Sequence, residues 1–513
     1  MRHPELLLGV DAGTGGTKAA LYDLGGALRG AATVPSRLHR DGAGRVEQDP
    51  REMEEELAEA VRGALAGAGA SGSDVAALAC DGQMAGIMFV GRDGRARGPY
   101  DSWLDTRCDP DVAAMRPHAE RVLQLTGGAP TYSHGPKLRW WLRERPEEVA
   151  SASAMVMPGS YLAGRLAGLS GADAFVDPTY LHFSCLADTE REVWSSELVE
   201  ALEVPERLLP RIVQPWDVIG EVTHEAAAAT GLRAGTPIAA GCGDTAAGLL
   251  GAGVVRPGVA LDVAGSASVL ATCVAHFHPD VDARMLFTAR TALEGVHYAL
   301  AYVQGGGLNL GWFRDAFARE LAPLATAEAF AALDAEAAGV PAGADGVRAS
   351  PHLGGRVTPH DPHGRGAFTG LGWAHGRGHL YRALLEAVAF EYALYLRATR
   401  GLHRDLGDVA VRAVGGGAAS ALWGRIKADV LGVSYHPLVR QEGGALGCAL
   451  LAGRAVGLIT DVATSAERFN ATSRAIEPDP ERHADYAPCI DDYASLLTLT
   501  SELGRRRTAP GAS

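Results

Sequence analysis

The segment that most constrains the fold is Leu6–Asp23, which reads LLLGVDAGTGGTKAALYD. Two apolar runs, each too short for a helix, flank a turn rich in glycine and threonine, and this pattern predicts a strand, a tight turn and a second strand. The glycines permit positive φ angles and a close approach of the backbone to a ligand. Backbone N–H groups, the Thr14 and Thr17 hydroxyls and the Lys18 ammonium would form a concave cationic surface that suits phosphate. Asp11 ends the first strand, where it could hold a metal ion directly or through water. The alternative at this point is an ordinary glycine-rich hairpin.

A similar pattern recurs at Val259–Leu270, where an apolar run, a small-residue turn and a second apolar run follow one another. Two hairpins of this kind, one opening each half of the chain, suggest a duplicated unit that clamps one polyphosphate from both sides.

The length of 513 residues exceeds what a single hydrophobic core supports, so two large domains are expected. The glycines between residues 253 and 258 mark the best boundary. We therefore predict an N-terminal domain over residues 1–254, a C-terminal domain over 255–500 and a flexible tail over 501–513.

The net charge of −14 argues against nucleic acid and acidic membranes as partners, and an anionic ligand would need a local cationic pocket. The seven cysteines include no C-x-x-C pair, which predicts reduced thiols and a cytoplasmic location. We expect neither a signal peptide nor a membrane-spanning helix. Lysine is almost absent, and the survivors Lys18, Lys137 and Lys427 either mark sites that need a compact charge or survive by chance.

Several loops at strand ends gather polar side chains. The loop Gly82–Gly86 follows a short buried strand, and in open α/β sheets ligands bind at such ends. Trp103–Arg107 combines an aromatic, an acid and a base, which suits a grip on a polyhydroxyl ligand or, alternatively, a structural ion pair with a packed tryptophan. Asp244 lies between a strand and a helix, where it faces the cleft or simply caps the helix.

Other predicted elements concern the periphery. We expect helices over Met155–Leu166 and from Pro488 to Leu503. A long loop, Ser350–Gly372, carries histidines at 352, 360 and 363 without metal-ligand spacing, and we expect these to be surface residues.

Taken together, these stretches resemble the FGGY family of carbohydrate kinases, and within it the members that phosphorylate xylulose. The likeness runs from about residue 6 to residue 500. The matching segments, in order, are Gly9–Lys18, Glu47–Pro50, Gly82–Gly86, Trp103–Arg107, Gly241–Gly248, Gly265–Ser268, Pro351–Gly372, and Leu384–Glu386 with Gly415–Gly432.

The resemblance implies an α/β fold of two actin-like (ribonuclease-H-like) domains, with ATP and Mg²⁺ and a small sugar in the cleft between them. It implies Asp244 as catalytic base and Asp11 as the acid associated with metal and phosphate. The implied nucleotide-binding residues are Thr14, Gly15, Gly16, Thr17, Lys18, Gly265, Ser266, Gly307, Gly417 and Ser420. The implied sugar-binding residues are Gln83, Met84, Trp103, Asp105, Arg107, Asp244 and Thr245.

The chain departs from the family pattern at Ala85, where a histidine is usual, and at Thr245, where an asparagine is usual. Lost hydrogen-bond partners discriminate strongly among hydroxylated substrates, so D-xylulose or a related ketose is the leading expectation and another ketose or a polyol the alternative. Two competing hypotheses are a non-catalytic sugar- or nucleotide-binding regulator and an actin-like ATPase that drives a partner. A homodimer is the family default.

Overall fold

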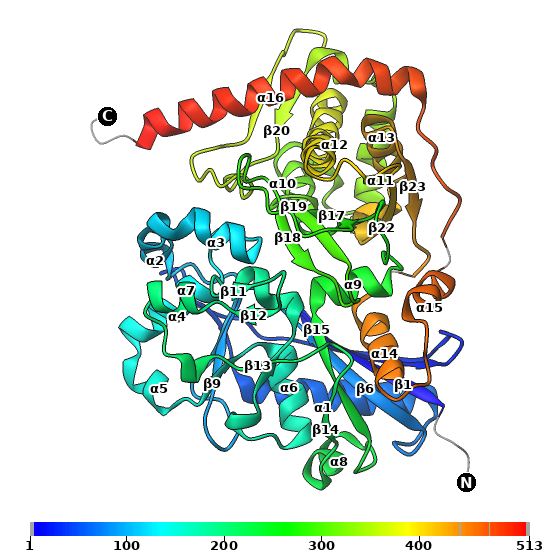
Figure 1. Cartoon of the computed structure of the whole chain (residues 1–513). Helices are drawn as coiled ribbons and strands as arrows, with labels where there is room; N and C mark the ends of the chain where they lie inside the picture. Colours follow the sequence, from blue (N-terminus) through cyan, green and yellow to red (C-terminus); the bar gives the residue numbers. More distant parts are fainter. Residues whose placement is uncertain (1–4, 441–442, 471, 509–513) are drawn as a thin grey trace.

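The computed structural model describes residues 5–440, 443–470 and 472–508. It contains two six-stranded sheets, one in the lower and one in the upper part of Figure 1. The first sheet has the order β14-β15-β6-β1-β2-β3, with the bounds Val218–Glu221, Pro237–Gly243, Val75–Gly82, Leu6–Ala12, Gly16–Asp23 and Leu28–Pro35. The second has the order β18-β19-β17-β16-β22-β23, with the bounds Phe287–Arg290, His297–Val303, Ser268–Val274, Val259–Ala264, Ala410–Val414 and Ser434–Pro437.

Five strands of each sheet are paired in the same pattern, whereas the sixth strands, β14 and β18, lie at opposite ends of that pattern. Strand β1 pairs antiparallel with β2 and parallel with β6, which in turn is parallel to β15. Strand β16 pairs antiparallel with β17 and parallel with β22, which in turn is parallel to β23. Beyond the hairpins, β3 and β19 occupy matching antiparallel positions. The predicted hairpins and the predicted duplication are both confirmed.

Helices cover both faces of the first sheet. Helix α1 (Pro50–Ala68) starts at Pro50 behind the cap Asp49, whose side chain accepts a hydrogen bond from the Arg51 N–H. On the opposite face lies α14 (Gly443–Ala455), and Gly9 of β1 has to be glycine because a Cβ there would meet the backbone oxygen of Ala445. Strand β1 is therefore apolar on both sides, as the uninterrupted run at residues 6–8 requires.

Helix α14 lies close to β1 and β6 although it comes late in the sequence (Figure 1). Its alanines and leucines join the apolar cluster of Leu7, Ala77 and Ala239, and the following α15 (Val462–Phe469) joins the same cluster. The division at residue 254 remains a proposal, and it does not describe α14 and α15, which pack on the sheet of the first half.

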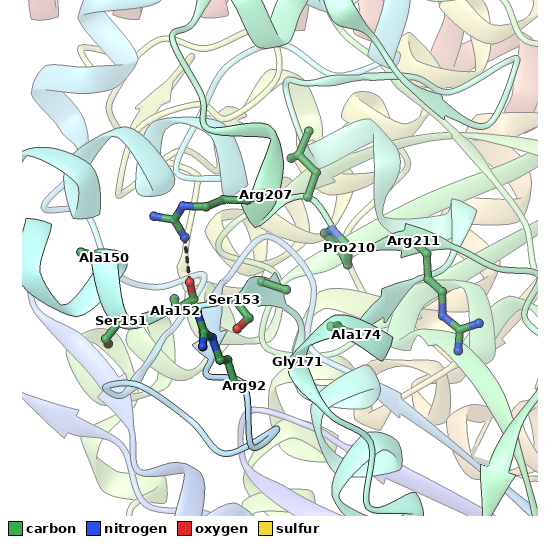
Figure 2. A pocket seen from close by; sticks show the side chains of 13 residues that line it. Arg92, Ala150, Ser151, Ala152, Ser153, Gly171, Ala174, Arg207, Pro210 and Arg211 are labelled. Carbon is green, nitrogen blue, oxygen red and sulfur yellow. Dashed lines mark hydrogen bonds between the residues drawn. The ribbon is translucent and has the colours of Figure 1, made fainter.

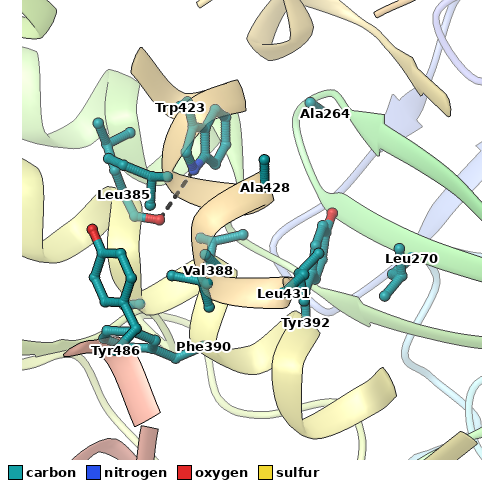
Figure 3. Packing of buried hydrophobic residues seen from close by; sticks show 14 of the residues in the cluster. Ala264, Leu270, Leu385, Val388, Phe390, Tyr392, Trp423, Ala428, Leu431 and Tyr486 are labelled. Carbon is teal, nitrogen blue, oxygen red and sulfur yellow. Dashed lines mark hydrogen bonds between the residues drawn. The ribbon is translucent and has the colours of Figure 1, made fainter. Parts of the chain in front are cut away.

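The core of the second half lies between its sheet and a layer of helices that includes α12 (Arg377–Leu402), α13 (Ala421–Leu431) and α16 (Pro480–Thr508). Figure 3 shows the buried Trp423 of α13 packing against α12, where its indole N–H donates to the Leu385 backbone oxygen at 3.0 Å.

The remaining helices are short or lie at the periphery. They are α2 (Asp109–Ala114), α3 (Ala119–Thr126), α4 (His134–Glu144), α5 (Pro146–Ser151), α6 (Pro158–Ala167), α7 (Ser196–Ala201), α8 (His224–Thr230), α9 (Asp244–Gly251), α10 (Gly307–Phe317) and α11 (Thr326–Ala338). The described part of the chain contains no helix with the length and apolar character needed to cross a bilayer.

Three peripheral predictions need correction. Met155 lies in a strand, β9 (Ala154–Val156), that pairs with β7 (Met88–Val90), and the helix starts only at Pro158. Helix α16 begins at Pro480 and runs through Pro488 to Thr508, so it covers the first part of the expected tail, whereas residues 509–513 lie outside the described residues. His352 is buried, because its ring pairs with the buried Glu391 of α12 at 2.8 Å.

Candidate active site

Three carboxylates meet at one edge of the first sheet. Asp11 on β1 is paired in register with Asp81 on the parallel strand β6. Asp244 is the first residue of α9, directly after the next parallel strand β15. Carboxyl ends of neighbouring parallel strands share an edge, so the topology alone brings these acids together.

Burial and mutual repulsion set the charge of this acidic edge. Burial raises the pKa of Asp244 to about 7, and the charge of Asp11 adds to the effect, while hydrogen bonds from Thr245 oppose it. Burial also raises the pKa of Asp11, against a hydrogen bond with Asp81 and the charge of Lys18. The pKa of Asp81 lies well above its usual range because of burial and then the charges of Asp11 and Asp244.

The acidic edge has the donor chemistry of a magnesium site. Asp81 is fully buried, its Oδ2 accepts from the Cys448 thiol at 3.4 Å, and its Oδ1 has no hydrogen-bond partner among the described residues. No group of three His, Cys, Asp or Glu side chains in the described ranges is arranged to hold a metal by itself. Mg²⁺ at phosphoryl-transfer sites is held by one or two carboxylates together with phosphates and water, so the two acids Asp11 and Asp81 fit it.

The first hairpin turns between β1 and β2. The Gly13 N–H donates to the Gly16 oxygen at 3.1 Å, and Lys18 stands opposite Asp11 in the register, so both side chains lie on one face. Thr17 alternates to the other face, where it is 2% exposed and donates to Glu56 at 3.1 Å. The prediction that the Thr17 hydroxyl faces phosphate is therefore wrong, because strand alternation turns it toward α1.

The second hairpin turns between β16 and β17 and is held by backbone groups. The Gly265 N–H donates to the Ala267 oxygen at 3.0 Å, and the Gly307 N–H donates to the Gly265 oxygen at 2.9 Å. The Leu308 N–H donates to the Ser266 oxygen at 3.1 Å. The start of α10 is thus bonded to the turn, which brings together the predicted nucleotide residues 265, 266 and 307.

The glycine stretch after β22 lies against the second hairpin. A Cβ on Gly415 would meet the Ala264 oxygen at 2.7 Å, and one on Gly417 would meet the Trp423 ring at 2.5 Å. Ser420 caps α13 by accepting from the Trp423 N–H at 3.0 Å, and it donates to Asp334 of α11 at 2.6 Å. Gly417 therefore adjoins the hairpin, whereas the Ser420 hydroxyl is engaged with the protein.

The predicted sugar residues divide into two groups. Met84 packs on Gly243, directly before Asp244, and Gln83 is 1% exposed beside the first hairpin. Trp103 is 37% exposed, and its indole N–H donates to Thr14 at 2.8 Å. These three residues, which lie near Asp244 and Thr14, form the group beside the acidic edge and the first hairpin.

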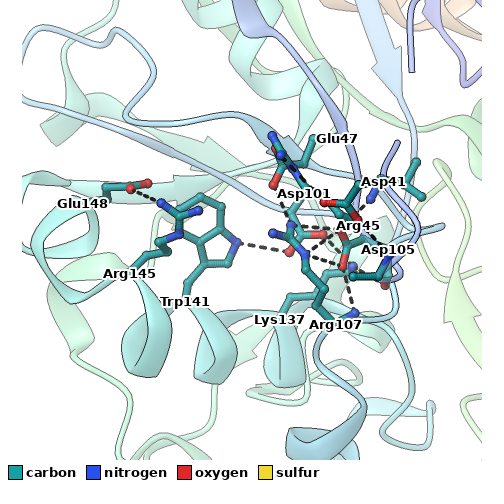
Figure 4. A network of polar contacts seen from close by, with 12 residues as sticks. Asp41, Arg45, Glu47, Asp101, Asp105, Arg107, Lys137, Trp141, Arg145 and Glu148 are labelled. Atoms are coloured by element: carbon teal, nitrogen blue, oxygen red, sulfur yellow. Dashed lines mark hydrogen bonds and ion pairs between the residues drawn. The ribbon is translucent and has the colours of Figure 1, made fainter. Parts of the chain in front are cut away.

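Asp105 and Arg107 form the second group, an ion pair within a network of polar contacts that also includes Glu47, Asp101 and Lys137 (Figure 4). Arg107 contacts Asp105 at 2.9 Å and Glu47 at 2.7 Å, and its guanidinium lies 4.2 Å from the centre of the Trp140 ring. Asp105 is 1% exposed and also accepts from the Val46 N–H at 2.7 Å. Because its carboxylate is fully engaged, the geometry favours the structural alternative for this pair.

Two residues beside the acidic edge could not be identified from the sequence. It gave no role to Asp81, or to Gly444 of α14, whose Cβ would meet Oδ2 of both Asp11 and Asp81 within 2.9 Å. It did flag Lys137 through the scarcity of lysine, and Lys137 is fully buried and donates to Asp101 at 2.8 Å in the same network of polar contacts (Figure 4).

A cavity of about 610 Å³ on the first half contains none of the predicted site residues (Figure 2). Its arginines include Arg207, which donates to the Ala152 backbone oxygen at 2.7 Å.

Comparison with known proteins matches both halves of the chain. The model of the N-terminal domain of the FGGY family of carbohydrate kinases matches residues 6–251, and the model of the C-terminal domain of that family matches residues 269–456. The chain is 26% identical over 502 residues to the xylulose kinase of Bacillus subtilis, covering 97% of each chain. It is 30% identical over 520 residues to the autoinducer-2 kinase of an Enterobacter species, covering 96% of this chain and 93% of the relative.

Solved structures agree in fold. The xylulose kinase from Rhodospirillum rubrum superimposes with a TM-score of 0.88 at 29% identity, covering 98% of this chain and all of that one.

Proposed function

The chain belongs to the FGGY family of carbohydrate kinases, and we propose that it transfers the γ-phosphoryl group of MgATP to a hydroxyl of D-xylulose or a related ketose, with Asp244 as the general base. As a sugar kinase it is a phosphotransferase that uses ATP and an alcohol acceptor. The observation that carries the proposal is the position of Asp244, which interacts electrostatically with Asp11 and Asp81 and directly follows Gly243, on which Met84 packs.

Phosphoryl transfer needs in-line positioning, charge neutralisation and help in removing the hydroxyl proton. Asp244 would accept that proton, and its pKa of about 7 is matched to the task. Lys18 and the N–H groups of both hairpins would bind the phosphates, and Ser266 is exposed at the second turn. Asp11, supported by Asp81, would hold Mg²⁺, which supplies neutralisation of the phosphate charge when it is bound.

The proposed nucleotide site comprises the backbone of residues 14–18, the Lys18 side chain, Gly265, Ser266, Gly307, Gly417 and Ser420. The proposed sugar site comprises Gln83, Met84, Trp103 and Asp244, with Thr245 beside the base and Asp105 and Arg107 in the network of polar contacts. The division at residue 254, a homodimer and a cytoplasmic location also remain proposals.

The sugar is the open part of the proposal. The relatives named xylulose kinase support D-xylulose as the substrate. The 30% identity to a relative named autoinducer-2 kinase supports autoinducer-2 as a second candidate substrate. Ala85 favours neither outright, because it removes an imidazole from the sugar site without supplying another polar group.

The test is a coupled assay of ADP release over D-xylulose, other ketoses, polyols and autoinducer-2, with Asp244→Asn as the matched variant. We expect D-xylulose to stimulate ADP release, and we expect the asparagine variant to bind MgADP normally while turning over roughly 10²–10⁴-fold more slowly. If only autoinducer-2 stimulates ADP release, the proposed substrate D-xylulose is wrong and autoinducer-2 takes its place. If the Asp244→Asn variant turns over at the wild-type rate, Asp244 is not the general base.

A further inference from the structure

The Thr14 hydroxyl at the tip of the first hairpin forms hydrogen bonds with two residues of the proposed sugar site, Trp103 and Gln83. It accepts from the Trp103 indole N–H at 2.8 Å and donates to Gln83 Oε1 at 3.0 Å. The Gln83 amide then donates to Gln48 Oε1 at 2.7 Å. A hydrogen-bonded relay of four side chains, Trp103, Thr14, Gln83 and Gln48, therefore connects the sugar side of the site to the first phosphate hairpin.

The relay uses up the hydrogen of the Thr14 hydroxyl. A hydroxyl has one hydrogen to donate, and here it goes to Gln83, so Thr14 is not free to donate to a phosphate in this arrangement. Its bonds instead fix the tip of the turn, for which the described residues otherwise supply two backbone bonds, from the Gly13 N–H to the Gly16 oxygen and from the Ser36 N–H to the Gly15 oxygen. The orientation of the N–H groups that would face phosphate thus depends on Trp103 and Gln83.

The far end of the relay is rigid. Gln83 and Gln48 are 1% and 2% exposed, and a buried amide that loses its partner pays the cost of desolvation, so these bonds resist rearrangement. Gln48 lies on β5 (Val46–Gln48), beside Glu47, which holds Arg107 of the buried ion pair. Trp103, at 37% exposed, is the one member of the relay open to a ligand on the sugar side.

We propose that Trp103 is a positioning residue for the nucleotide. Through its hydrogen bond to Thr14 it fixes the conformation of the first phosphate hairpin, so that the sugar site and the phosphate site are energetically coupled. This inference rests on the proposed kinase function, because it assumes that the hairpin binds the nucleotide phosphates. Coupling between two sites is reciprocal, so sugar contact with Trp103 changes nucleotide affinity by the same factor as the nucleotide changes sugar affinity.

The test is MgADP binding by titration calorimetry, without sugar. Trp103→Phe keeps a six-membered aromatic ring but removes the five-membered part of the indole with its N–H, and we expect it to weaken MgADP binding about fivefold. Thr14→Val should weaken binding by a similar factor, Thr14→Ser should restore it, and the double variant Thr14→Val/Trp103→Phe should be no weaker than either single variant.

A second tryptophan supplies the matched control. Trp194 donates its indole N–H to the Pro210 oxygen at the same 2.8 Å, outside the proposed site. Trp194→Phe therefore loses an equal bond, and we expect unchanged MgADP affinity. In steady-state assays Trp103→Phe should raise the KM for ATP more than it lowers kcat, which a general loss of stability would not produce.

The outcomes separate the two proposals. Wild-type affinity in Trp103→Phe, or additive losses in the double variant, would overturn the relay and leave the kinase function intact. Absence of MgADP binding by the wild-type protein would overturn the kinase function and the relay with it. A shared, non-additive loss with rescue by serine would support the relay.

Discussion

The two hairpins have the same pairing topology but opposite chemistry. In the first, Asp11 stands beside Lys18 at the cleft edge, and side chains from the opposite wall hold the tip. In the second, Val263 takes the position two residues before the turn glycine, and the tip is held by backbone bonds from α10. The acid of the second hairpin is Asp262, one residue earlier, so that strand alternation turns it into the core.

Asp262 is buried, and the charge of its carboxylate is compensated by Lys427. Lys427 lies 2.5 Å from its Oδ2 and 3.9 Å from the centre of the Trp423 ring, and Tyr392 donates to Oδ1 at 2.7 Å. Asp11 of the first hairpin lies beside Lys18 and also beside two further acids, Asp81 and Asp244. A one-residue shift of an acid along otherwise matching strands thus separates an acid of the proposed active site from a structural ion pair. Under the proposed function, the first half would carry the chemistry and the second would hold the nucleotide through its backbone.

The sharpest test of that contrast changes one residue at each turn. Asp11→Asn should lower kcat on the order of 10³-fold, because the charge stabilisation supplied through a bound metal is worth several kcal/mol. Ser266→Ala should lower it about fivefold or less, because the backbone donors of the second turn remain. Steady-state kinetics with saturating MgATP measures both, and equal losses would refute the division of labour.

The next test compares two lysines, one expected to contribute mainly to stability and the other mainly to ATP binding. Lys427→Met leaves Asp262 buried without its cation and should cost about 3–5 kcal/mol of unfolding free energy, measured by urea denaturation. Lys18→Met at the half-buried cleft edge should cost about 1 kcal/mol or less while it weakens ATP binding. The double variant Lys427→Met/Asp262→Asn should recover part of the loss, and if it is as unstable as the single variant, the ion pair is not the cause.

The contrast between the halves was partly predictable. Both hairpins and the position of Asp244 follow from short apolar runs that end in small or acidic residues. The rarity of lysine also pointed to Lys137 and Lys427, which pair with buried aspartates. The faces of the strands were predictable in principle, because period-two alternation puts Thr17 opposite Lys18.

Long-range packing was not predictable from one sequence. The Ala- and Gly-rich pattern of α14 indicates burial on all sides but not which sheet buries it, and the sheet it chooses is that of the first half. The loop histidine His352 is buried by an acid 39 residues away, and Asp105 is engaged by residues up to 59 positions distant. Such partners are set by the fold rather than by local spacing.

A third test concerns pH. In the described part of the chain no buried cation pairs with Asp244 as Lys427 pairs with Asp262. The pKa of Asp244 in the folded protein is about 7, above the value near 3.9 of an unfolded chain. Between these values the folded state binds more protons than the unfolded state, so this group makes stability fall as pH rises to about 7. Asp244→Asn should therefore stabilise the protein at pH 8 by roughly 1–2 kcal/mol, allowing for partial solvent contact, and by little at pH 4. Urea denaturation without nucleotide or Mg²⁺ measures this, and a pH-independent difference would contradict it.

The smallest expected effect compares the loops that follow the matching strands β6 and β22. After β22 the positive φ of 91° falls on Gly415, whereas after β6 a φ of 61° falls on Ala85, beside the proposed sugar residues. A left-handed conformation costs an L-residue about 1–2 kcal/mol, and substitution by glycine removes this cost. Part of the resulting gain in stability is lost, because glycine has more conformational freedom in the unfolded chain. Ala85→Gly should therefore raise the free energy of unfolding by about 0.5 kcal/mol and leave MgADP affinity unchanged, as measured by urea denaturation and calorimetry. A loss of stability would mean that the Ala85 methyl group contributes more through its contacts than its backbone costs, and the two loops would then differ in packing rather than in strain.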